Sequence, residues 1–187
     1  MPRCVSRALR FAILPWLVVW LGGVASPQAQ PRVSDREVKA VFLFNFAQFV
    51  EWPQAAFENP QSPIVIGVLG EDPFSRTLDD VVKGETVRNR QLIVTRYRRV
   101  EDIMTCHILF VSASETQRYE PILASLRGRP TLTVGETEGF ATRGGMVRFV
   151  SERNRVGLHV NVGAAKAAGL TISSNLLRPA KIVDGVH

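Results

Sequence analysis

The sequence predicts an α/β layered domain with a largely parallel sheet and one antiparallel hairpin near an edge. Short apolar runs alternate along the chain with segments that carry helix-capping residues, which is the pattern of α/β layers. The run IVIGVL, between Pro63 and Gly70, is apolar throughout, as expected for a strand buried on both faces. The 187 residues are 45% hydrophobic and show no internal repeat or composition break, which favours a single domain.

The first expected element is a long helix in the segment EVKAVFLFNFAQFVEWP. Ser34 and Glu37 have the spacing of a capping box, so the helix should begin at Asp35. Pro53 disfavours helical geometry at the residue before it, so the helix should end within a residue or two of Glu51. At 100° per residue, the predicted core face consists of Val38, Phe42, Phe46, Phe49 and Val50.

The opposite side of this helix mixes polar and apolar side chains. Either both sides are covered within the domain, or the helix presents an apolar strip to a partner. An exposed strip would also favour a homodimer. Under the second interpretation, the partner-binding candidates on the mixed face are Val41, Phe44 and Trp52.

The remaining strands are expected where apolar runs are bounded by turn residues. The last two of these runs flank a short polar segment and should form the hairpin. With the run at 64–69, the prediction is a sheet of five to six strands. The other expected strands are Gln91–Tyr97, His107–Ser112, Thr131–Val134, Met146–Ser151 and Val156–Asn161.

Four further helical segments are expected from their caps. Asp72, with Pro73 at the first helical position, should begin a helix that ends at Gly84. A short connector at 100–105 is also expected to be helical. The other expected helices are one capped by Ser114 and running to about Leu126, one at Val162–Ala168 capped by Asn161, and a final one capped by Ser173 or Ser174 and interrupted by Pro179.

The N-terminus has the layout of a secretory signal peptide. Three arginines without an acid precede an apolar run at 11–24, and small residues follow. Cleavage is expected after Ala25, or as late as Ala29, and a retained anchor is the alternative. The expected organisation is therefore a signal peptide at 1–25, a lead-in at 26–34 and one exported domain at 35–187.

Loss of the leader changes how charge and cysteine content are interpreted. Removing the three leader arginines lowers the formal charge from +6 to +3, and nucleic acid is not an expected partner of an exported, mildly basic protein. Cys4 leaves with the leader, so Cys106 is the only remaining cysteine and no intrachain disulfide is expected. Its apolar surroundings favour a buried, inert thiol over one that reacts or pairs with another chain.

No catalytic or metal-binding pattern is present in the sequence. His107, His159 and His187 lie far apart, without HxxH, HExxH or Cys/His spacing. No serine lies in a G-x-S-x-G elbow, and no glycine-rich phosphate loop occurs. The sequence therefore predicts neither an enzyme nor a bound cofactor or metal.

Two polar segments have both a structural and a functional interpretation. Glu71 and Asp72 follow the strand at 64–69, where open α/β sheets bind ligands, and could orient a small polar ligand; simple helix capping by Asp72 is the alternative. A group of arginines suits either a solvated strand edge or attraction to anionic headgroups or an acidic partner. These arginines are Arg88, Arg90, Arg96, Arg98 and Arg99.

Taken together, the segments KAVFLFNFAQFVEWP, PIVIGVLGEDPF, CHILFVS, TLTVGETEGFATRGGMVRFV and VGLHVNVGAAKAAGLTISSNLL resemble the YfiR family of exported proteins, which includes HmsC-like members. The resemblance extends from about Val38 to Val183. It implies a three-layer α/β/α sandwich and a non-enzymatic periplasmic repressor. Such a repressor binds the periplasmic sensor domain of an inner-membrane diguanylate cyclase, and an OmpA-like outer-membrane lipoprotein captures it, raising cyclic di-GMP and promoting biofilm.

The sequence departs from this family in its cysteines. Members often carry disulfides, one of which uses the cysteine that corresponds to Cys106. The expected partner position is Gly67 here, and a second, later pair is absent, which argues against redox control. The function expected from the resemblance is a regulator that acts by protein contact. A periplasmic small-ligand-binding domain that uses the turn near Gly70 is the alternative, and an exported hydrolase is disfavoured.

Overall fold

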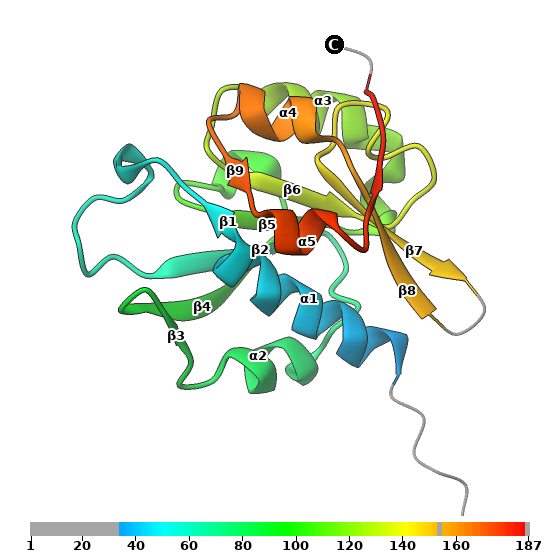
Figure 1. The fold of residues 1–187 in the computed structure, drawn as a ribbon. Coiled ribbons are helices and arrows are strands. Elements are labelled where there is room, and N and C mark those ends of the chain that lie inside the picture. Colours follow the sequence, from blue (N-terminus) through cyan, green and yellow to red (C-terminus); the bar gives the residue numbers. More distant parts are fainter. Residues whose placement is uncertain (1–33, 153–154, 186–187) are drawn as a thin grey trace, which may run out of the picture. The chain divides into compact units, whose positions relative to one another are not determined.

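The computed structural model describes residues 34–152 and 155–185 (Figure 1). The expected signal peptide and lead-in lie outside the described residues, except for Ser34. Within these residues, the main sheet has the strand order β10-β8-β7-β6-β5-β2-β4-β3. Its strands are β2 (Ile64–Leu69), β3 (Thr86–Val87), β4 (Arg90–Tyr97), β5 (Ile108–Val111), β6 (Leu132–Gly135), β7 (Val147–Glu152), β8 (Arg155–Val160) and β10 (Lys181–Ile182).

The α/β fold class with a largely parallel sheet is confirmed, but the strand count was too low. The six strands of four or more residues match the six apolar runs, and the sheet has two additional strands, β3 and β10. Each of these has two residues, too few to produce a periodic pattern. The β7–β8 pair is the expected antiparallel hairpin. β3 also pairs antiparallel with β4, while the other pairs of the main sheet are parallel.

Two hydrophobic clusters lie on opposite faces of the sheet. In β5, Ile108 and Phe110 belong to the cluster that contains α1 and α2, whereas Leu109 and Val111 belong to the cluster that contains α3. This alternation is why the strand is apolar at successive positions. The helices, seen on the two sides of the sheet in Figure 1, are α1 (Asp35–Phe49), α2 (Arg76–Val82), α3 (Tyr119–Ser125), α4 (Val162–Ala167) and α5 (Ser174–Leu177).

Helix α1 begins where its cap predicts. The Ser34 side chain accepts a hydrogen bond from the Glu37 amide, and the Glu37 carboxylate accepts one from the Ser34 amide. The predicted core face was partly wrong, because Val38, Phe42 and Phe49 are only half-buried. The fully buried side is rotated toward two alanines, whose small side chains allow close packing. It comprises Ala40, Leu43, Phe46 and Ala47, followed by Val50.

Three of the other predicted helices differ from the structure at their ends. Helix α2 begins at Arg76, after the Asp72–Pro73 segment, so Asp72 does not cap it. Ser112, not Ser114, caps a 3₁₀ helix at Ala113–Arg118 that leads into α3. The last predicted helix stops at Leu177, before Pro179, and the chain then forms β10. A proline lacks the amide hydrogen that would continue the helix, which explains the stop.

Candidate functional site

The outer face of α1 carries two of the three predicted partner-binding residues. Val41 is 45% exposed, whereas Phe44 is half-buried and packs against the first hydrophobic cluster. The two side chains lie three positions apart on the helix and therefore share one face. The apolar strip is consequently small, with Val41 as its exposed member.

Trp52 does not belong to this helical face, because it is not in the helix. Helix α1 ends at Phe49, and Val50 is already extended, with φ −108° and ψ 141°. Val50 and Glu51 form β1, which pairs antiparallel with β9 (Thr171–Ile172) in a separate two-stranded sheet. The projection that placed Trp52 on the α1 surface was therefore wrong. Pro53 favours an extended backbone at Trp52, which takes this residue out of the helix.

The Trp52 side chain is anchored at the start of β5. Its Nε1–H donates to the His107 carbonyl oxygen at 3.1 Å, and its ring meets the His107 ring edge-on at 6.1 Å. Phe57 stacks on His107 at a ring-centre distance of 4.5 Å, and the Arg90 guanidinium lies 3.7 Å from the Phe57 ring centre. We call Trp52, Phe57, Arg90 and His107 the His107 stack. It fastens the segment after α1 to the sheet.

His107 is buried as a neutral imidazole with both nitrogens in use. Its Nδ1 accepts a hydrogen bond from the Val65 amide at 3.1 Å, so Nδ1 carries no proton. Its Nε2 lies 3.2 Å from the Ala56 carbonyl oxygen and must carry the hydrogen that is donated there. Burial lowers the pKa of His107 below its usual value of 6.5, because charging the ring would desolvate an ion and break the bond from Val65.

We expect the domain to lose stability as the pH falls below 6.5. Above that pH the ring is neutral in both the folded and the unfolded states and contributes no pH dependence. Below it, the unfolded chain binds a proton that folded His107 resists, so the free energy of unfolding decreases until the lowered pKa of the folded ring is reached. Urea unfolding at a series of pH values between 7.5 and 5 measures this slope.

The control for this prediction is His107→Gln, whose amide can also accept from Val65 and donate to Ala56. This variant should show a shallower decrease between pH 6.5 and 5. The pKa of His159 is also lowered, by partial burial and by the nearby Lys181 and Arg148, so His159→Gln measures the remaining contribution. An unchanged slope in His107→Gln would show that His107 does not set the acid sensitivity.

Two of the clustered arginines bind backbone carbonyls and do not simply extend into solvent. Arg88 donates to the carbonyl oxygens of Gln48 and Val50 at 3.3 Å each, at the C-terminal end of α1. Arg90 donates to the carbonyl oxygens of Asn59 and Ser62, in addition to its contact with Phe57. These bonds favour a structural interpretation for both residues, since they hold the 48–62 segment against β4.

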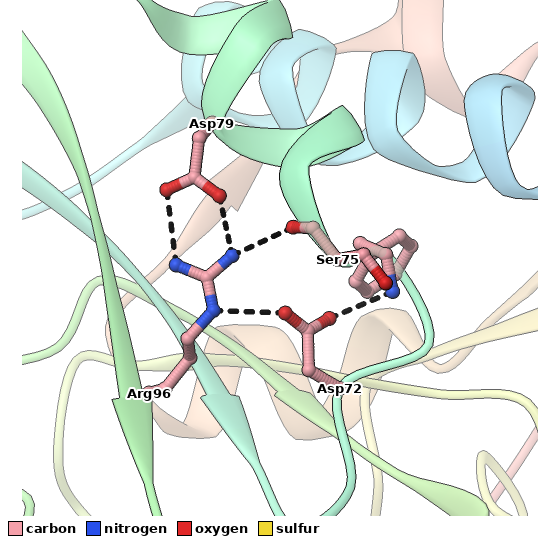
Figure 2. A network of polar contacts seen from close by, with 5 residues as sticks. Asp72, Ser75, Asp79 and Arg96 are labelled. Carbon is pink, nitrogen blue, oxygen red and sulfur yellow. Dashed lines mark hydrogen bonds and ion pairs between the residues drawn. The ribbon is translucent and has the colours of Figure 1, made fainter.

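Arg96 forms a closed network at the carboxyl end of the sheet (Figure 2). Its Nε donates to Asp72 at 2.8 Å, both terminal nitrogens donate to Asp79, and one of them also donates to the Ser75 carbonyl oxygen at 2.8 Å. The hydrogen bond from Arg96 lowers the pKa of Asp79, and the carboxylates in turn raise that of Arg96. Ser75 has a positive φ of 52°, a strained geometry that this network helps to hold.

In the predicted ligand-binding turn, most polar groups already form hydrogen bonds within the protein. Asp72 accepts from Arg96 and from the Phe74 amide, while Glu71 keeps an exposed side chain and donates its amide hydrogen to Ser114 Oγ. Gly70 has φ +89°, and a Cβ there would lie 2.5 Å from Ser114 Oγ. Ligand binding by Glu71 and Asp72 stays a prediction, and only Glu71 has its side chain directed to solvent.

Cys106 is buried next to Gly67. Burial raises the pKa of the thiol to about 12, so little thiolate forms at neutral pH. A Cβ built at Gly67 would lie 2.7 Å from Cys106 Sγ, which shows that the two positions are direct neighbours. Within the described part of the chain, no group of three or more His, Cys, Asp or Glu side chains is arranged to hold a metal ion.

A helix that spans a bilayer needs about 20 consecutive, mostly apolar residues. Among residues 34–152 and 155–185, none of the helices is both long and apolar enough to span a bilayer.

Comparisons with known proteins complete this description. No curated protein matches the sequence. A solved structure described as the ABC domain in complex with L-Trp from Streptococcus pneumonia is similar at 11% identity and a TM-score of 0.47. The match covers 64% of this chain and 55% of that one, so the chain spans about half of its length. The model of the YfiR/HmsC-like family matches residues 36–181, nearly the whole described domain. This chain belongs to the YfiR/HmsC-like family.

Proposed function

We propose that this protein is a periplasmic repressor that binds the periplasmic sensor domain of an inner-membrane diguanylate cyclase and holds the cyclase inactive. An OmpA-like outer-membrane lipoprotein relieves the repression by capturing the repressor. The observation that carries the proposal is the family match over residues 36–181, because the family is one of periplasmic, non-catalytic regulators of diguanylate cyclase. The apolar N-terminal segment at 11–24 agrees with export.

Repression by binding requires a difference in affinity between two states of the cyclase. The repressor must bind the inactive sensor domain more tightly than the active one, because equal affinity shifts no equilibrium. Capture by the lipoprotein then acts by mass action, since it lowers the concentration of free repressor.

The proposed contact surface is the outer face of α1 at Val41 and Phe44. Val41 supplies exposed apolar area, and half-buried Phe44 supplies a rigid neighbour held by the core. Rigid, partly buried aromatic side chains are typical anchors at protein interfaces. Trp52 contributes indirectly in this scheme, because its hydrogen bond to His107 fixes the segment that follows α1.

We expect Val41→Asp to weaken binding to the cyclase sensor domain by roughly 30-fold or more, as removal of an interface anchor does. The carboxylate would be desolvated without a partner in the complex, whereas in the free protein it remains in water. Calorimetric titration of the purified sensor domain measures the affinity, and the intracellular cyclic di-GMP level reports repression.

The matched control is Met104→Asp, which places the same charge at an exposed apolar residue outside α1 (86% exposed). It should bind and repress like the unchanged protein. Phe44→Asp provides a second test only if circular dichroism shows that it folds, because Phe44 also packs on the core. Normal repression by both α1 variants would exclude this face as the docking surface.

A further inference from the structure

Three basic side chains form a row across neighbouring strands at one end of the sheet. Arg148 of β7 lies directly opposite His159 of β8, and His159 lies directly opposite Lys181 of β10. Residues that pair directly across strands project from the same face of a sheet. Pairing alone therefore places Arg148, His159 and Lys181 side by side, although they are up to 33 positions apart in the sequence.

This row lies on the face of the sheet that carries α3, opposite the face that carries α1. Arg148 pairs with Gly135, which pairs with Val111, a member of the α3 cluster. The Phe140 ring covers Gly135, because a Cβ there would lie 2.7 Å from it. A hollow of about 730 Å³ opens over β8 and β10, lined among others by Val150, Gly157, His159 and Lys181.

Among the described residues, the negative charge near the row is that of Glu152, which acts on His159. Neither Arg148 nor Lys181 takes part in an ion pair there. Arg148 Nε is buried and has no hydrogen-bond partner in that part of the chain. Of the described residues that line the hollow, Glu152 is the one with a carboxylate, and it lies directly opposite Arg155 near the hairpin turn. An unpaired buried donor beside two other basic groups costs stability, and a bound anion would remove that cost.

We propose that the row of Arg148, His159 and Lys181 is a binding site for a small multivalent oxyanion, carrying carboxylate or phosphate groups. The guanidinium of Arg148 offers its fork of donors to one anionic group. Lys181 is two strand spacings away, about 10 Å at the backbone, and offers its ammonium to a second group. Neutral His159 lies between them and donates one further hydrogen bond. The hollow lined by His159 and Lys181 supplies the space for a compact ligand, and Arg148 is the neighbour of His159 across the β7–β8 pair, outside that lining.

This site is separate from the proposed docking surface. Val41 and Phe44 belong to α1, on the other face of the sheet, so the two surfaces share no residue. The proposal therefore goes beyond the repressor function and can be tested without any partner protein.

The test is calorimetric titration of the protein purified from the periplasm, with citrate in one arm and pyrophosphate in the other. Sodium chloride keeps the ionic strength constant, so that general screening contributes equally throughout. Saturable binding of one ligand per chain is expected in at least one arm, and the tighter arm identifies carboxylate or phosphate chemistry. Arg148→Gln and Lys181→Gln should each weaken this binding roughly tenfold, which is the loss of one charge-assisted hydrogen bond.

Arg98→Gln is the matched control, because it removes one exposed arginine elsewhere in the chain and should leave the affinity unchanged. Arg148→Lys keeps the charge but loses the fork and should fall between Arg148→Gln and the unchanged protein. Folding is checked without anion, where both glutamine variants should unfold at the same temperature as the unchanged protein or higher, since like charges are removed. Absence of saturable binding in both arms would overturn the proposal, as would an equal loss in Arg98→Gln. A third outcome is also informative. If the protein without substitutions binds neither anion, and Arg148→Gln loses binding to the sensor domain, that result overturns the row as an anion site and assigns it to a protein interface.

Discussion

A Gly67→Cys variant is expected to form a disulfide with Cys106 and to gain stability relative to its own reduced form. Position 67 already faces the thiol, with the built Cβ 2.7 Å from Cys106 Sγ. The cross-link closes a loop of 40 residues, from 67 to 106, for which chain-entropy arguments give a stabilisation of roughly 4 kcal/mol. The effect is expected because the bond restricts the unfolded chain much more than the folded one.

Relative to the protein with glycine at position 67, crowding by the new side chain offsets part of this stabilisation. A side chain at position 67 would also lie 2.9 Å from Leu109 and 2.9 Å from Tyr97, so the reduced variant should be destabilised by roughly 1–3 kcal/mol. The two contacting atoms belong to side chains, Cδ1 of Leu109 and Cε2 of Tyr97, which can shift. The informative quantity is therefore the difference in unfolding free energy between the oxidised and reduced forms of the same variant.

The measurement is urea unfolding of both forms, after refolding in a glutathione redox buffer. Refolding is needed because the raised pKa of buried Cys106 leaves too little thiolate for exchange in the folded protein. Gly67→Ser is the matched control, since it brings similar crowding without a second sulfur. Two titratable thiols remaining after refolding would show that the two positions are not close enough in solution to be joined.

Trp52→Ala is expected to reduce the free energy of unfolding by roughly 3 kcal/mol, because removal of a large, partly buried ring leaves a space beside His107 and the first hydrophobic cluster. Trp52→Phe keeps most of the apolar volume and loses the Nε1–H bond, so it should cost only about 1 kcal/mol. The cost is low because the His107 carbonyl oxygen still accepts a hydrogen bond from the Leu132 amide at 2.8 Å and is not left unpaired. Urea unfolding of the three proteins at pH 7.5 measures the series.

The same series separates an anchoring role of Trp52 from direct contact with a partner. An anchoring residue changes stability in proportion to the lost contacts, while Trp52→Phe binds the sensor domain normally. A residue at the interface itself would show the reverse pattern, with normal unfolding of Trp52→Phe and weakened binding. Unchanged stability in Trp52→Ala would contradict the role assigned to the His107 stack.

The parts of the fold that could be predicted are those determined by nearby residues. The start of α1 follows from Ser34 and Glu37, three positions apart, and the structure has that capping box. The Asn161 cap of α4 is likewise confirmed, with the Asn161 side chain accepting from the Ala164 amide. The six longer strands follow from apolar runs that report burial on one or both faces.

The errors arose where distant segments decide the local geometry. Arg96 of β4 engages Asp72, which had been expected to cap α2. Two-residue strands such as β10 have no pattern of their own and exist because a longer strand is available to pair with them. The rotation of the α1 core face toward Ala40 and Ala47 depends on how closely the helix approaches its neighbours, and hydrophobicity alone does not encode that distance.

The candidate sites also include features that the sequence predicts and features that only tertiary contacts create. The sequence by itself determined the α/β class, the family and an apolar opening helix with Val41 and Phe44 on one face, because capping and periodicity act within a few turns of the chain. Only the tertiary structure decided that Trp52 anchors to His107 and that Arg148, His159 and Lys181 stand in one row. Such contacts depend on strand order and register, which are set by packing and backbone pairing between residues far apart in the chain.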